Sequence, residues 1–245
     1  MRASISRILN GSRERLTRMV RGLAVLISLA SVSAPLGAQT LSDVMARMDK
    51  SAPQFKSMIA EMKRDVHTAI VNDDSMDNGT IKVKREKSET RMLIELKGPD
   101  AKAVSFDGKE ASVYYPKIKT VQIYNAGDKR DLIDDFLLLG FGNTSAELTA
   151  KFDVSFLGAA NVDGKPASHL QLLPKSKDVL RRLKRADLWI SDALGIPVQQ
   201  QLFWPASGDF MLVTYSNMKL NPPASEMGPM KLNLPKGVHI EHPQL

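Results

Sequence analysis

The sequence predicts a mainly β (α+β) protein, in which a single antiparallel sheet is covered on its apolar face by a few short helices. Three observations support this class. Apolar and polar residues alternate in one segment after another from residue 80 onward, which is the pattern of strands with one buried face. Short glycine-containing turn sequences separate these segments. The 245-residue chain is 43% hydrophobic and 25% charged, a composition typical of a soluble globular protein.

Residues 1–38 have the pattern of a cleavable signal peptide. Six arginines precede the apolar run from Gly22 to Ala38, after which polarity returns. An uncleaved membrane anchor is the weaker alternative, because Ser28 and Pro35 interrupt a run already shorter than the roughly 20 residues that a spanning helix needs. We expect cleavage after Ala38, export to the periplasm and one mature domain over residues 39–245.

Charge and cysteine content exclude several function classes. The chain carries a net charge of +7, of which residues 1–38 supply five charges through six Arg and one Glu, so +2 remains for the mature protein. No basic stripe with interleaved aromatic residues is left, and we therefore exclude nucleic acid as a partner. The absence of cysteine excludes disulfides, thiolate metal sites and a lipidated cysteine, so the mature protein should be free in its compartment.

The first elements of the mature chain are predicted from helical spacing. Apolar residues fall at i, i+3, i+4 and i+7 in the segment that begins at Thr40, which predicts an amphipathic helix started by Thr40 or Ser42 and closed by Pro53. The next segment, Phe55–Val66, fits both helical spacing and strand alternation. Its structure is left open at this point.

Strands and turns then alternate to the end of the chain. We expect hairpin turns at 77–79 (DNG), 107–109 (DGK), 163–165 (DGK) and 207–209 (SGD), so consecutive strands should pair as antiparallel neighbours. A short basic helix or turn at Ser176–Arg185 interrupts the later strands. The alternating apolar residues include Ile81 and Val83, Val104 and Phe106, Val113 and Tyr115, Val121 and Ile123, and Phe152, Val154 and Phe156.

The segment LIDDFLLLGFGN, Leu132–Asn143, is far more apolar than its surroundings. We expect a helix with acidic residues near its N-terminus, favourable to the helix dipole, that ends at Gly140 or Gly142. Such a helix would lie across the mouth of a curved sheet as a cover. An ordinary core helix is the alternative.

No motif in the sequence points to catalysis. The four histidines are scattered without a second ligand at suitable spacing, and no nucleophile-elbow, phosphate-loop or dinucleotide motif is present. Adjacent acidic pairs such as Asp134–Asp135 point in different directions and cannot share a substrate. The sequence therefore favours a non-enzyme, with no catalytic residue, metal site or cofactor.

Several segments follow one another along the mature chain: GTIKVKRE, FDGKEASVYYPKIKTVQIY, the apolar segment above, LQLLPK, LWIS leading to GIPVQQQLFW, and KLNLPKGVHI. Their order resembles that in the LolA family of periplasmic lipoprotein carriers. The resemblance covers nearly the whole mature chain. It implies that the sheet is curved into an incomplete barrel, with helices plugging an apolar cavity that takes the acyl chains of lipoproteins.

The resemblance also suggests where the ligand binds. Arg85, in the sequence Val83-Lys84-Arg85, corresponds to a basic residue expected to latch the lid or to release the lipoprotein. This chain departs from the family pattern because Glu86 replaces the usual proline, and a plain strand-edge role for Arg85 stays open. The predicted lipid- or lipoprotein-binding residues are Ile81, Val83, Arg85, Tyr115, Leu132, Phe136, Leu137 and Leu139.

We therefore expect a monomeric periplasmic carrier that shields lipoprotein acyl chains and ferries them from the inner to the outer membrane. Its expected partners are an acylated lipoprotein or another lipid, an inner-membrane lipoprotein-release complex and an outer-membrane acceptor. The alternative is a periplasmic lipid-sensing or scaffold protein of the same fold that acts through a protein partner. Sensors of that type usually add a second domain, for which the mature chain has no room.

Overall fold

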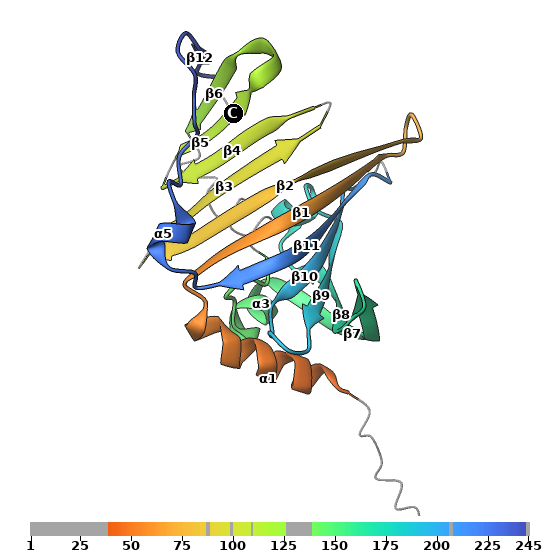
Figure 1. Cartoon of the computed structure of the whole chain (residues 1–245). Coiled ribbons are helices and arrows are strands. Elements are labelled where there is room, and N and C mark those ends of the chain that lie inside the picture. Colours follow the sequence, from red (N-terminus) through yellow and green to blue (C-terminus); the bar gives the residue numbers. More distant parts are fainter. Residues whose placement is uncertain are drawn as a thin grey trace, which may run out of the picture. The chain divides into compact units, whose positions relative to one another are not determined.

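The computed structural model describes residues 39–86, 89–98, 100–108, 110–125, 139–205 and 208–243. Within them lies one 12-stranded, mostly antiparallel sheet that is not closed into a barrel, together with a few short helices (Figure 1). This confirms the predicted fold class. In the part of the chain that is described, no helix is long and apolar enough to cross a membrane.

The bounds of the elements are as follows. The strands are β1 (Ser57–Thr68), β2 (Asp73–Glu86), β3 (Glu89–Lys97), β4 (Lys102–Asp107), β5 (Glu110–Tyr115), β6 (Thr120–Asn125), β7 (Phe152–Val162), β8 (Lys165–Pro174), β9 (Arg185–Ser191), β10 (Pro197–Phe203), β11 (Phe210–Leu220) and β12 (His239–Glu241). The helical segments are α1 (Leu41–Ser51), η1 (Ala52–Gln54), η2 (Pro116–Ile118), α3 (Ser145–Lys151), α4 (Lys177–Leu180) and α5 (Ala224–Met227).

The sheet consists of two antiparallel meanders, β1–β6 and β7–β11. In each meander, strands that follow one another along the chain pair with one another, as predicted from the turn sequences. The antiparallel pairing of β1 with β11 joins the two meanders, so β6 and β7 lie toward opposite edges of the sheet (Figure 1). The last strand, β12, departs from the prediction because it pairs in parallel with the edge of β6.

Helix α1 forms where the spacing predicts it, and the structure identifies Thr40 as its N-cap. The Thr40 hydroxyl accepts a hydrogen bond from the Asp43 backbone, and the Asp43 carboxylate accepts one in return from the Thr40 backbone, completing a capping box. The ambiguous segment that follows is a strand. This strand, β1, pairs with β2 on one side and with β11 on the other, so the alternation of its residues and not their helical spacing describes the structure.

The turn predicted at Asp77–Gly79 is wrong, because these residues lie inside β2. The hairpin between β1 and β2 instead turns at residues 69–72, where Asn72 has a φ of 48°. Gly79 serves close packing of the strands: a Cβ atom there would lie 2.2 Å from the carbonyl oxygen of Glu95. Asp77 is 4% exposed and forms an ion pair with Arg64 on β1.

The other predicted turns are found between strands. Asp163 and Gly164 both have positive φ, 49° and 77°, in the tight connection from β7 to β8. Gly108 connects β4 to β5, and Gly208 lies between β10 and β11. The short basic helix predicted after Ser176 is α4.

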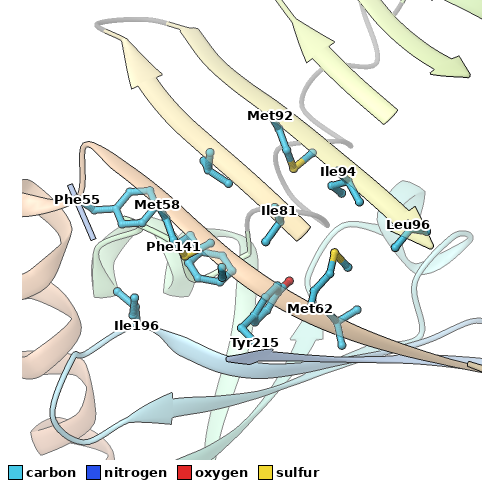
Figure 2. Close-up of a cluster of buried hydrophobic side chains, with 13 residues drawn as sticks. Phe55, Met58, Met62, Ile81, Met92, Ile94, Leu96, Phe141, Ile196 and Tyr215 are labelled. Carbon is cyan, nitrogen blue, oxygen red and sulfur yellow. The ribbon is translucent and has the colours of Figure 1, made fainter. Parts of the chain in front are cut away.

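One face of the sheet, here called the inner face, carries the core. On β7–β9 this face is covered by α1, whose Val44, Met45 and Met48 are buried together with α3 in one hydrophobic cluster. Arg47 fixes α1 there by donating hydrogen bonds of 2.9 Å to the Ser168 hydroxyl and 3.1 Å to the Asp192 carboxylate. A second cluster lies on β1–β3 and β11 (Figure 2).

Candidate ligand-binding site

The inner face contains a cavity of about 200 Å³ at the junction of the two meanders. Its walls come from β1–β4 on one side and from β10 and β11 on the other. Most of the lining is apolar, and the polar lining residues are Arg64, Lys102, Gln200 and Tyr215. The complete lining is Met62, Arg64, Ile81, Ile94, Leu96, Lys102, Val104, Gln200, Leu202, Met211, Val213 and Tyr215.

Strand register places these side chains on a common face. Ile94 on β3 pairs with Ile81 on β2 and with Val104 on β4, so the three side chains point to the same side of the sheet. Across the junction, Met62 on β1 pairs with Tyr215 on β11. The alternation in each strand thus produces a continuous apolar surface once the register is set.

Residues 139–142, here called the plug, fill the inner face beside the cavity. Leu139 is 3% exposed in the cluster under α1, and Phe141 is 1% exposed in the cluster on β1–β3. The Phe141 ring packs edge-on against Tyr215, with 5.2 Å between ring centroids, and lies 6.0 Å from the Phe55 ring. Since Tyr215 also lines the cavity, the plug and the cavity share a wall (Figure 2).

Side chains of the sheet hold the plug through its backbone carbonyl groups. Arg85 donates hydrogen bonds of 2.7 Å to the Gly142 oxygen and 3.2 Å to the Phe141 oxygen. Gln200 donates a buried 2.5 Å hydrogen bond to the Leu139 oxygen and accepts one of 2.8 Å from the Tyr215 hydroxyl. The buried amide and phenol thus satisfy each other, as buried polar groups must.

The plug needs its two glycines. Gly140 and Gly142 have φ values of 85° and 67°, in the left-handed region that side chains disfavour. A Cβ atom at Gly140 would lie 2.7 Å from Pro197, and one at Gly142 would lie 2.7 Å from the Arg85 guanidinium. The GFG sequence therefore allows the backbone to approach the sheet closely while Phe141 enters the core.

The cavity is charged at one end. Arg64 is ion-paired with Asp77, and Lys102 lies nearby on β4. Burial lowers the pKa of Lys102, and the positive charge of Arg64 lowers it further. Burial has the opposite effect on Tyr215, whose pKa it raises because the phenolate would be desolvated.

The predicted binding residues have different positions. Ile81 lines the cavity, and its neighbour on the same face, Val83, is fully buried in the adjoining cluster. Arg85 contacts the plug, and Leu139 is part of it. Tyr115 on β5 is half-buried and does not line the cavity.

The remaining predicted binding residues, Leu132, Phe136 and Leu137, lie outside the described residues, as does most of the helix predicted there. Residues 139–142 form a turn in which both glycines have positive φ, and the helix end expected at Gly140 or Gly142 stays a prediction. Within the ranges that the structure describes, no group of three or more His, Asp or Glu could hold a metal ion.

Sequence reasoning missed the polar lining residues. Arg64 and Lys102 are charged residues in alternating strands, and charge alone would assign them to the solvent face. Gln200 is one of three consecutive glutamines in β10, and no local signal distinguishes it from its neighbours. Lys102 could have been found from its phase, because it precedes Val104 and Phe106 at a spacing of two.

No protein-family model matches this chain, and no curated protein matches it. Solved structures with a similar fold include MucB, at 14% identity and a TM-score of 0.47, over 77% of this chain and 62% of MucB. They also include a LolA superfamily protein from Nitrosomonas europaea, at 14% identity and a TM-score of 0.37, over 78% and 97% of the two chains.

A third similar structure is a domain of an outer-membrane lipoprotein-sorting protein from Vibrio parahaemolyticus, at 13% identity and a TM-score of 0.40, over 77% of this chain and 96% of that domain. The chain therefore spans about three fifths of MucB but nearly all of the other two structures. These likenesses assign no family and no function to it.

Proposed function

We propose that this protein is a periplasmic carrier that binds acyl chains on the inner face of its sheet. The observation that carries the proposal is the shared wall at Tyr215, which separates an apolar cavity from a plug that is held largely through its backbone. Moving Phe141 away from Tyr215 would extend the cavity along the inner face. The protein would thus exchange its own apolar side chains for those of a ligand.

The size of the cavity supports this exchange. About 200 Å³ is less than the roughly 300–1,000 Å³ of ordinary small-molecule sites. A long acyl chain cannot enter until buried side chains leave. Phe141 and Leu139 fill adjoining apolar volume, because each is buried in a cluster that also contains cavity-lining residues.

The energetics of release favour such a plug. At about 0.8 kcal/mol per buried methylene group, one fully enclosed acyl chain of ~16 carbons would contribute roughly 12 kcal/mol, close to nanomolar affinity. A carrier with that affinity would retain its cargo. If the plug returns to the core as the ligand leaves, part of this free energy is recovered, and a receiving protein can compete for the ligand.

In this proposal residues 1–38 direct export and the mature protein acts as a monomer. It would receive an acylated lipoprotein or another lipid from an inner-membrane release complex and pass it to an outer-membrane acceptor. Leu132, Phe136 and Leu137 would extend the plug, and Tyr115 would extend the inner face toward β6. Arg85 would latch the plug in the empty state.

Native mass spectrometry tests the proposal. The protein is produced from the full chain in a bacterial host and purified from the periplasm without detergent, alongside Val104→Glu and Ser105→Glu. Val104 lines the cavity, whereas Ser105 is on the opposite face of the same strand. We expect co-purifying lipid or lipoprotein on the wild type and on Ser105→Glu but not on Val104→Glu. Ligand-free masses for all three folded proteins would contradict the carrier and favour a scaffold.

A further inference from the structure

Two positive side chains lie at one end of the cavity, where its lining is otherwise apolar. Arg64 and Lys102 both line it, and they are close enough for the charge of Arg64 to lower the pKa of Lys102. The ammonium group of the half-buried Lys102 has neither a hydrogen bond nor an ion pair with any residue that the structure describes, although the more distant Asp77 and Asp100 carboxylates favour its charge. A charge kept in such a position without a partner is costly to the empty protein.

The two carboxylates near Lys102 favour its charged form, but each is also paired with another cation. Asp77 forms an ion pair with Arg64, and the Asp100 carboxylate lies 3.8 Å from the Lys117 ammonium group. These five side chains together carry a net charge of +1. Arg64 also keeps a buried Nε atom without a hydrogen-bond partner in the described chain. This end of the cavity is therefore short of one negative charge and of acceptor oxygens.

The charged end and the plug lie at opposite ends of the same apolar surface. Asp77 and Arg85 are eight residues apart on β2, which corresponds to roughly 26 Å along an extended strand. Ile81 and Val83 lie between them on the inner face. Figure 2 shows the same order, with Leu96 at the end of the cluster remote from Phe55.

We propose that Lys102, supported by Arg64, binds the anionic head of an acyl amphiphile, a carboxylate or a phosphate, while the acyl chain runs along the inner face toward Phe141. This inference rests on the proposed function, because it names the class of ligand that the carrier takes. The head would supply the missing negative charge and acceptor oxygens. The tail would replace the plug.

Three probes with the same acyl chain separate the head from the tail: palmitate, 1-palmitoyl-lysophosphatidic acid and the uncharged 1-palmitoylglycerol. Inorganic phosphate is the fourth probe, because it carries a charge without a chain. Binding to the protein purified after delipidation is measured by titration calorimetry for the wild type, Lys102→Met and Lys63→Met. Lys63 is the matched control, since it neighbours Arg64 on β1 but is on the outer face.

We expect the wild type and Lys63→Met to bind the two anionic probes about tenfold more tightly than 1-palmitoylglycerol, as a charge-assisted hydrogen bond predicts. In Lys102→Met this preference should disappear while the affinity for 1-palmitoylglycerol is kept. Phosphate alone should bind far more weakly than lysophosphatidic acid.

Different failures have different meanings. Equal affinity of the wild type for the charged and uncharged probes, or an equal loss of preference in Lys63→Met, would overturn the head-group site and leave the carrier intact. Phosphate that binds as tightly as lysophosphatidic acid would assign Lys102 to a free anion and would also overturn the inference. Failure of every acylated probe to bind would overturn the proposed function together with it.

Discussion

The Arg85 guanidinium donates a 2.7 Å hydrogen bond to the carbonyl oxygen of Gly142, tying β2 to the end of the plug. A second donor of the same side chain reaches the neighbouring carbonyl at 3.2 Å. Planar guanidinium groups can bind two adjacent oxygens in this way, whereas a lysine ammonium is a point charge on a flexible stem. The plug is therefore fixed by the shape of one side chain as well as by its charge.

Replacing Arg85 by lysine should loosen the plug without removing a positive charge. We expect the loss of one charge-assisted hydrogen bond to lower the free energy of unfolding by about 1.5 kcal/mol. Amide hydrogen exchange of residues 140–143 should become faster than in the wild type. Arg91→Lys is the control, because Arg91 lies on the neighbouring strand β3 and this substitution should leave that exchange unchanged. Equal exchange rates in the two variants would contradict the role of Arg85 as a latch.

Truncation of Phe141 should create space that a ligand can fill. Phe141→Ala is expected to lower the free energy of unfolding by about 3–4 kcal/mol, because the residue is 1% exposed and the core cannot fully collapse. Palmitate should then raise the thermal midpoint of Phe141→Ala more than that of the wild type. Ile190→Ala, buried on β9 away from the cavity, should be destabilised without this rescue. Rescue of both variants would argue against a ligand at the plug.

A matched pair of substitutions can separate the cost of positive φ at a glycine from the cost of a steric clash there. Gly142 and Gly164 both have positive φ, but a Cβ atom meets the Arg85 guanidinium only at Gly142, and nothing lies within 4 Å at Gly164. Gly164→Ala should cost about 1 kcal/mol of backbone strain, and Gly142→Ala at least about 2 kcal/mol, as measured by urea unfolding. Equal costs would mean that the contact with Arg85 is easily relieved.

The buried Tyr215 hydroxyl predicts a pH dependence of stability. Because its pKa is raised in the folded protein, the unfolded chain loses this proton first, near pH 10, and the free energy of unfolding falls as the pH rises above that value. Tyr215→Phe should reduce this fall and should cost about 1 kcal/mol near neutrality through the lost hydrogen bond to Gln200. Urea unfolding at several pH values, with Tyr124→Phe as the control, measures both effects; identical slopes in the two variants would contradict the burial argument.

Lys102 should matter for ligand binding and not for folding. Burial and then Arg64 lower its pKa, so the ligand-free protein becomes more stable as the pH rises from that lowered pKa toward the ordinary value of 10.5. At pH 7 we expect the free energy of unfolding of Lys102→Met to be within about 0.5 kcal/mol of the wild-type value, or higher. A loss of more than about 1 kcal/mol in urea unfolding would show instead that Lys102 supports the fold.

Local periodicity predicted most of the fold. The α1 helix and the alternating strands follow from side-chain spacing within single segments, and Thr40 and Gly164 follow from local cap and turn chemistry. The turn predicted at Asp77–Gly79 was wrong because a sequence that favours a turn can also occur within a strand. Its Asp balances Arg64, and its Gly admits the neighbouring backbone of Glu95. Both reasons lie on other strands and are invisible locally.

The site was predictable only in part, because it depends on the register between strands. Ile81, Arg85 and Leu139 were singled out from sequence, and the structure places them at the cavity or the plug. The opposite wall could not be foreseen, since no local pattern pairs Met62 with Tyr215. Lys102 was missed because a charged residue in an alternating strand is ordinarily taken as exposed.

The pairing of β1 with β11 has a consequence for how the chain folds. It is the one antiparallel pairing in the described sheet that joins strands far apart in sequence, and such contacts close large loops and therefore form late. The cavity is lined from both sides of this pairing, by Ile81 and Ile94 on one side and Gln200 and Leu202 on the other. Before this pairing forms, the chain can hold two separate meanders, each with an exposed apolar face and no cavity. The cavity is therefore completed only when this pairing forms, and under the proposed function a chain without it would lack its binding site.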